Sequence, residues 1–241
     1  MASMNFKAVR KERGWTQQNA ARQLGVSQTL VSFWERGTRS PSRRCLDKLC
    51  YLGVKLDPVT LPMRADSDSA AVDFAQELAN LGYPGFAHYQ NGAPKWNPAQ
   101  LLVLALAENA LDRRVAEALP WLVLRYSEMN WEWVRREAKL RDLQNRLGFT
   151  LLLGQELAVR KEGSEVAHQL ATLEQDLRRS LLAKEDTYCN DRITRSERNW
   201  LRQHRSQEAA VWNLLSDLRP EHLAHDTDVL ARDDSRRAGS Q

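Results

Sequence analysis

The sequence Trp15–Gly37, WTQQNAARQLGVSQTLVSFWERG, contains two short helical patterns on either side of a tight turn. Thr16 can cap the first helix, because a threonine hydroxyl accepts a hydrogen bond from an otherwise unpaired backbone N–H. Gly25 stands where this helix must end and the chain must reverse, a position that favours a left-handed backbone. Ser27 can cap the second helix, which ends at Gly37. The stretch therefore predicts two helices joined by a turn of a few residues.

The apolar residues of both helices fall on one side. Ala20, Ala21 and Leu24 share a face at helical spacing, and Val31 and Trp34 point inward from the second helix. The outer face of the second helix is left to Gln28, Thr29, Ser32 and Phe33. This is the helix-turn-helix geometry, in which the second helix enters the major groove of DNA.

At these positions the sequence resembles the lambda-repressor/Cro-type (XRE) family of helix-turn-helix domains. The resemblance covers roughly residues 5–57 and is carried by Arg13-Gly14-Trp15-Thr16-Gln17, Ala21, Leu24-Gly25-Val26-Ser27, Val31-Ser32, Trp34-Glu35-Arg36-Gly37 and Pro41. It implies a domain of four or five helices that binds DNA and regulates transcription. It also implies that Gln17 contacts a phosphate and that Glu35 pairs with Arg22 to lock two helices together.

Gln28 is the side chain best suited to read a base, because its amide can form two hydrogen bonds with adenine. Thr29 and Ser32 can approach other base edges. Two interpretations of Phe33 remain open: contact with a thymine methyl, or packing within the protein or against a second copy. Arginines near the end of the second helix are candidate phosphate contacts, which position a protein without reading sequence. The candidate DNA-binding set is Gln17, Ser27, Gln28, Thr29, Ser32, Phe33, Arg36, Arg39 and Arg43.

The 241-residue chain has a net charge of only +4, but the charge is unevenly distributed. Residues 1–57 contain eleven Lys and Arg against four Asp and Glu, a net charge of +7, whereas the remainder carries −3. A basic head on a mildly acidic body is typical of a DNA-binding module attached to another domain. No apolar run approaches the roughly 18 residues that span a membrane, and no signal peptide is evident. We therefore expect a cytoplasmic protein.

The rest of the chain predicts an all-α fold. The N-terminal domain is expected to end at residue 57, with a linker over 58–69, a larger helical domain over 70–220 and a disordered tail over 221–241. The expected helices cover 70–81, 98–111, 113–126 with a break or kink near Ala118 imposed by Pro120, a segment from 131 that bends or divides at Gly148, 164–184 and 196–218. Thr194 and Glu197 predict a capping box, and no strand of convincing length is expected.

The sequence offers no catalytic machinery. The five histidines are scattered, and no HExxH motif, glycine-rich phosphate loop or nucleophile elbow occurs. The three cysteines have neither the spacing of metal ligands nor that of a disulfide framework. We therefore predict no enzyme activity, no catalytic residue, no cofactor and no metal site.

The segment 139–149 is dense in Asn, Gln and Arg beside apolar positions. It fits either a solvated helix face or a surface that binds a partner or small ligand, with the candidate residues Trp131, Lys139, Arg141, Gln144, Asn145 and Arg146. The patterns over 164–184 and 196–218 fit either a hairpin or a dimer seam. The sequence thus favours a dimeric repressor of a palindromic DNA operator, or more specifically an autoregulating antitoxin or phage-defence regulator. The alternative is a protein that neutralises a partner such as a toxin, or acts as a scaffold, with DNA binding secondary.

Overall fold

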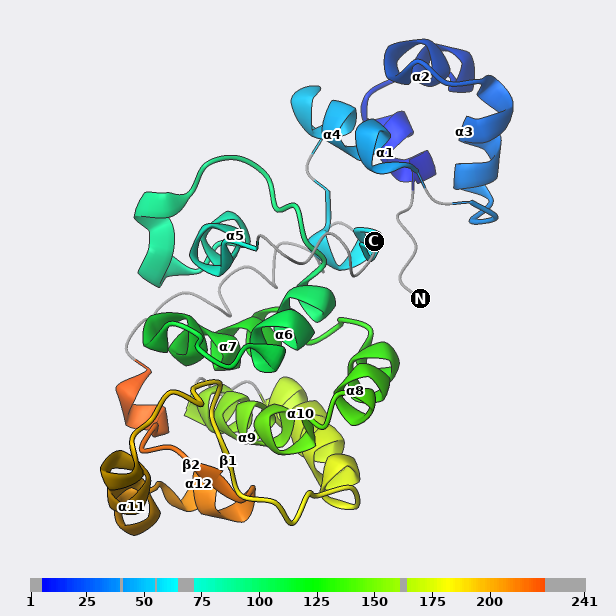
Figure 1. Cartoon of the computed structure of the whole chain (residues 1–241). Coiled ribbons are helices and arrows are strands. Elements are labelled where there is room, and N and C mark those ends of the chain that lie inside the picture. Colours follow the sequence, from blue (N-terminus) through cyan, green and yellow to red (C-terminus); the bar gives the residue numbers. More distant parts are fainter. Residues whose placement is uncertain (1–5, 40, 55, 65–71, 161–163, 224–241) are drawn as a thin grey trace.

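The computed structural model describes residues 6–39, 41–54, 56–64, 72–160 and 164–223, and Figure 1 shows their arrangement. α-Helices dominate, so the all-α prediction is confirmed, and the strands in the described part are two residues long. In chain order the elements are α1 (Phe6–Glu12), α2 (Gln17–Leu24), α3 (Gln28–Glu35), α4 (Arg43–Tyr51), η1 (Pro58–Thr60), α5 (Phe74–Asn80), η3 (Pro84–Tyr89), α6 (Pro98–Ala107), α7 (Arg113–Arg125), α8 (Trp131–Leu140), α9 (Gln144–Arg160), α10 (Ser164–Arg178), β1 (Asp186–Thr187), α11 (Arg195–His204), α12 (Gln207–Val211), β2 (Leu214–Leu215) and η4 (Pro220–His222).

Helices α1 to α4 gather around a core of their own at one end of the molecule (Figure 1). Phe6 and Trp34, both buried, meet edge to face with their ring centroids 5.3 Å apart. Ala20, Ala21 and Leu24 of α2 fill the same core, as their spacing predicts. Burial of apolar area is the main stabilising contribution in so small a domain, so these side chains determine how α2 and α3 are held.

The larger body is organised around α9, which packs against α7, α8, α10 and α12. Its two glycines allow this close packing. A Cβ at Gly148 would lie 2.3 Å from the indole of Trp212, and a Cβ at Gly154 would lie 2.6 Å from Val123. The prediction that the chain bends or divides at Gly148 is therefore wrong: α9 runs through both glycines, and the division from α8 comes at 141–143, where Asp142 has a φ of 56°.

α7 runs through Pro120 from Arg113 to Arg125, so the predicted break near Ala118 does not occur. A proline inside a helix leaves the carbonyl four residues earlier, here that of Ala116, without its usual donor. The buried hydroxyl of Tyr188 donates a long hydrogen bond of 3.5 Å to this carbonyl and lies 2.9 Å from the hydroxyl of Thr150. The body thus supplies a replacement donor at the site of the missing N–H.

The segment expected to form one helix over 196–218 contains two short helices and a strand instead. α11 begins with the predicted capping box of Thr194 and Glu197, but ends at His204, and Ser206 caps α12. β2 then pairs in parallel with β1, Asp186 opposite Leu214. Both strands are only two residues long, which agrees with the expectation of no strand of convincing length in this part of the described chain, and their pairing satisfies backbone groups between the helices.

Part of the expected linker lies fixed on the body. The amide of Asn97, at the start of α6, donates to the carbonyls of Val59 and Leu61 over 2.9 and 2.8 Å. Gln100 exchanges two hydrogen bonds with the backbone of Arg64, and the Arg64 guanidinium lies over the ring of Trp96. We call residues 57–64 the strap. The rest of the expected linker, 65–69, and most of the expected tail, 224–241, lie outside the described residues.

Candidate nucleic-acid interface

The turn between α2 and α3 is built as the sequence predicts. The hydroxyl of Thr16 accepts from the backbone N–H of Asn19 and caps α2. Gly25 has a φ of 70° and a ψ of 40°, the left-handed conformation that only glycine adopts readily. The hydroxyl of Ser27 accepts from the N–H of Leu30 over 3.2 Å and caps α3. These local contacts fix α3 relative to α2 across the three-residue turn 25–27.

The outer face of α3 is available to a ligand. Val31 and Trp34 are buried in the core, whereas Gln28 and Thr29 are exposed. Ser32 and Phe33 lie half-buried beside them, and Ser27, at the start of the helix, is exposed. The first turn of α3 thus presents an amide and a hydroxyl, the groups that hydrogen-bond to base edges in a major groove.

Two arginines are grouped around Phe33 at the other end of this face. The guanidinium carbons of Arg36 and Arg39 lie 5.1 and 5.6 Å from the centroid of the Phe33 ring. The carbonyl of Phe33 also accepts from the N–H and hydroxyl of Thr38 and from the N–H of Arg39. A guanidinium near the face of an aromatic ring is attracted to the ring electrons, so these contacts help to hold both arginine side chains near Phe33. Phe33 and the turn after α3 therefore place two exposed cations side by side.

Glu35 joins three elements of the domain from the last turn of α3. Its carboxylate accepts from Arg10 of α1 and, over 2.8 Å, from the side-chain amide of Gln17 at the start of α2. The hydrogen bond from Arg10 lowers the pKa of Glu35 below its usual value, against the opposing effect of burial. The expected Glu35–Arg22 pair is therefore wrong, since Arg22 is exposed and Arg10 is the cation that pairs with Glu35.

Gln17 accordingly has a structural contact that the family resemblance did not imply. Sequence reasoning also missed Lys48 of α4, whose ammonium donates to the carbonyl of Leu24 over 3.0 Å at the end of α2. A cation at a helix C-terminus is stabilising, and the position of Lys48 one helix later gave no local signal of that role. The remaining candidate, Arg43, begins α4, and its side chain lies outside the described residues.

Four of the six candidate partner residues on the body do not lie on a surface. Gln144, Asn145 and Arg146 are buried, and Trp131 is buried too, whereas Lys139 and Arg141 are exposed. The guanidinium of Arg146 pairs with Asp186 over 2.8 Å and with Asp191, and donates to two backbone carbonyls. This corrects the prediction: the polar residues of the segment fasten the start of α9 to the β1 region, because a buried cation needs such partners.

Membrane-spanning helices and metal-binding groups are absent from the described residues. No helix among them has both the length and the apolar character that crossing a bilayer requires. Nor do the same residues contain a group of three His, Cys, Asp or Glu side chains placed to hold a metal ion. Cys45, Cys50 and Cys189 form no disulfide bond.

Comparison with known proteins agrees with the geometry of the N-terminal domain. Residues 6–57 match the helix-turn-helix family model. That family is a DNA-binding regulatory domain and not an enzyme family. The search of curated proteins and the search of solved structures gave no match for the chain. The protein carries an XRE-type helix-turn-helix domain at its N-terminus and is a DNA-binding transcription regulator of that kind.

Proposed function

We propose that the protein is a dimeric repressor that binds a palindromic operator with α3 of each protomer. The observation that carries this proposal is the exposed face of α3, where Gln28 and Thr29 lie on the same helix as Phe33 with its two arginines. Helix-turn-helix dimers place their recognition helices in half-sites about one helical turn, roughly 10 bp, apart. Repression follows if the bound dimer covers a promoter, and the protein then acts in the cytoplasm.

In this proposal the two parts of the chain have separate tasks. Residues 1–57 bind DNA, and their net charge of +7 supplies attraction to phosphates that does not depend on sequence. Residues 70–220 hold two copies together and respond to a signal. They contain equal numbers of basic and acidic residues, so they add no net charge attraction to DNA.

The test is a mobility-shift assay with the full chain and the DNA upstream of its own gene. A specific complex that survives competitor DNA at moderate salt, with a stoichiometry of two chains to one site, is the expected result. Gln28→Ala should weaken that complex while leaving binding to unrelated DNA unchanged. Absence of any specific shift, or a specific complex with one chain, contradicts the proposal.

A second candidate function is the binding of a partner protein such as a toxin, in an autoregulated antitoxin or phage-defence system. One observation favours it: Leu140 is 73% exposed at the end of α8, between the exposed Lys139 and Arg141. A large exposed apolar side chain with a cation on either side in the sequence suits a partner surface that is apolar with an acidic margin. Co-purification with the product of a neighbouring gene, lost in Leu140→Asp but retained in Gln28→Ala, would support this function.

A further inference from the structure

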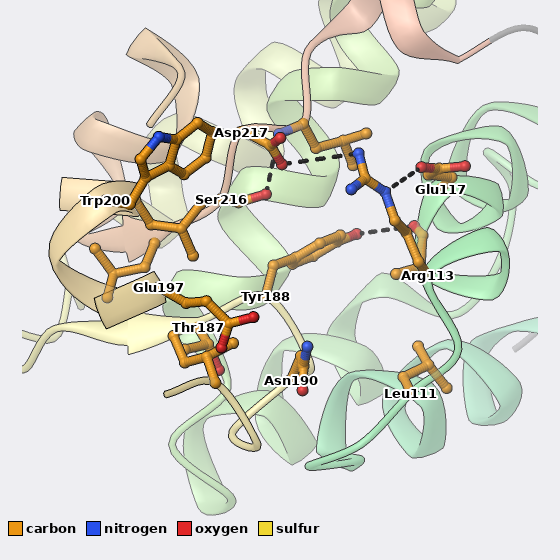
Figure 2. A pocket seen from close by; sticks show the side chains of 15 residues that line it. Leu111, Arg113, Glu117, Thr187, Tyr188, Asn190, Glu197, Trp200, Ser216 and Asp217 are labelled. Atoms are coloured by element: carbon orange, nitrogen blue, oxygen red, sulfur yellow. Dashed lines mark hydrogen bonds and ion pairs between the residues drawn. The ribbon is translucent and has the colours of Figure 1, made fainter. Parts of the chain in front are cut away.

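A cavity of about 300 Å³ opens in the body, in a part of the chain that the DNA-binding function does not use (Figure 2). Four segments line it, three of them within residues 187–218 and one at residues 111–117. They are the start of α7, the segment after β1, α11 and the segment after β2. Ligand cavities of small molecules begin at about this size.

The floor of the cavity is apolar and rigid. Tyr188, Leu215 and Leu218 are buried there, and Ala116 of α7 completes the surface. The Tyr188 hydroxyl is held by its contacts with Thr150 and with the carbonyl of Ala116, so the ring is fixed across the middle of the cavity. An apolar group that enters would meet a preformed surface, which lowers the entropic cost of binding.

The charged groups that line the cavity have an acidic excess. Glu117, Glu197 and Asp217 face one cation, Arg113, which pairs with Glu117 at 2.9 Å and with Asp217 at 3.8 Å. The Glu197 carboxylate accepts from the N–H of Thr194 over 2.6 Å, which lowers its pKa and keeps it charged. With three carboxylates against one guanidinium, the lining carries a net charge of −2, which attracts cations.

An aromatic side chain completes the rim on the side opposite Arg113 (Figure 2). Trp200 is 50% exposed, unlike Trp96, Trp121, Trp131 and Trp212, which are buried. It stacks on His204, with ring centroids 4.4 Å apart and an interplanar angle of 12°. The stack orders a large aromatic surface at the cavity mouth, where an organic cation or a flat apolar group gains from contact.

From the apolar floor, the excess of carboxylates and the ordered Trp200, we infer that this cavity binds a small organic cation: an amine or guanidine with an apolar or aromatic body. Its cationic end lies toward the carboxylate of Asp217, whose contact with Arg113 is the longer of the two at 3.8 Å, and its apolar body lies on Tyr188. The inference concerns the body alone, so it stands or falls independently of the operator experiment.

The test uses isothermal titration calorimetry on the full chain at pH 7 with three probes of similar size: protonated 2-phenylethylamine, neutral 2-phenylethanol and anionic phenylacetate. The amine is expected to bind at least about tenfold more tightly than the alcohol. Equal affinities, tighter binding of phenylacetate, or no heat from the amine up to about 5 mM would overturn the inference.

Two variants locate the binding. Asp217→Asn should weaken binding of the amine and leave binding of the alcohol unchanged. Trp200→Ala should weaken binding of both. Glu128→Gln removes an exposed carboxylate beyond the other end of α7 and is the matched control, expected to bind as the parent does. A circular dichroism melt verifies that each variant is folded. Sedimentation of Trp200→Ala adds a check: conversion of a dimer to a monomer would make this cavity an interface between copies and would overturn the inference.

Discussion

The carboxylate of Glu35 accepts a hydrogen bond from the guanidinium of Arg10, and this pair fastens the last turn of α3 to α1. Both side chains are largely shielded from solvent, and Gln17 donates to the same carboxylate. The position of the recognition helix therefore depends on an ion pair as well as on the apolar core. DNA binding should respond to the state of this pair even though none of the three residues lies on the exposed face of α3.

Glu35→Gln should loosen α3 at neutral pH and have little effect in acid. The folded-state pKa of Glu35 is lowered by Arg10, so the charged pair stabilises the domain above the unfolded pKa of about 4.3 and loses its contribution as the pH falls through the folded value. Loss of the pair should cost roughly 1–3 kcal/mol at pH 7. Hydrogen exchange of the peptide over 28–35, measured at pH 7 and at acidic pH, tests this. The exposed Glu12→Gln is the control.

Gln28→Ala and Arg39→Ala should reduce DNA affinity in different ways. Loss of an amide that reads a base should cost about 1–3 kcal/mol on the operator alone. Loss of a phosphate contact should weaken all DNA sequences alike and reduce the slope of log K against log salt by about one. Binding titrations on operator and unrelated DNA at several salt concentrations separate the two. Identical behaviour of both variants would disprove this division of roles.

Phe33→Leu distinguishes the two interpretations of that residue. Because its ring lies against Arg36 and Arg39, we expect the variant to weaken binding to every DNA sequence, by roughly 0.5–2 kcal/mol, through less ordered arginines. A loss confined to operator sites with a thymine at one position would instead indicate contact with the thymine methyl. Titration of operator variants that replace thymine by uracil decides between them.

Arg146→Met should destabilise the body severely. The substitution leaves Asp186 and the carbonyls of Leu106 and Glu108 without their buried donor, which typically costs roughly 3–5 kcal/mol. Arg136→Met, which removes only an exposed pair with Glu137, should cost about 0–1 kcal/mol. Thermal unfolding followed by circular dichroism compares them. Similar melting temperatures would show that the Arg146 contacts are not essential.

Gly148→Ala tests the close packing of α9 on Trp212. The added methyl would lie 2.3 Å from the indole, so either ring or helix must move, at a cost of roughly 1–3 kcal/mol. Alanine normally stabilises a helix relative to glycine. The expected change in the free energy of unfolding therefore has the opposite sign to that predicted from helix propensity. Gln155→Ala, on the same helix and half-buried, is the comparison. Urea denaturation provides the free energy of unfolding.

The helix-turn-helix was predictable because its signals are local. Thr16, Gly25 and Ser27 each act on backbone groups within a few residues, and the apolar spacing places Val31 and Trp34 in the core. The exposure of Gln28 and Thr29 followed from the same spacing. The partner of Glu35 did not, because Arg10 is 25 residues away and only the packing of α1 brings it there.

The body was harder to predict, because distant residues override its local patterns. Pro120 and Gly148 are ordinary signals of helix interruption, yet the Tyr188 hydroxyl and the Trp212 indole make both compatible with continuous helices. From the sequence alone Arg146 is expected to be solvated, because its acceptors Asp186 and Leu106 are each 40 residues away in the chain. The cavity beside Tyr188 had no sequence signal, since four separate segments build it.

The strap changes the mechanics of the whole molecule. Leu61 belongs to the core of the N-terminal domain while its carbonyl is held by Asn97 of the body, so the two parts share a joint instead of a slack tether. A flexible linker of about a dozen residues would let each N-terminal domain move over tens of ångströms relative to the body. In a dimer joined through the bodies, the distance between the two N-terminal domains would instead be fixed by the protein. An operator lengthened by one or two base pairs would then present its second half-site at the wrong helical phase.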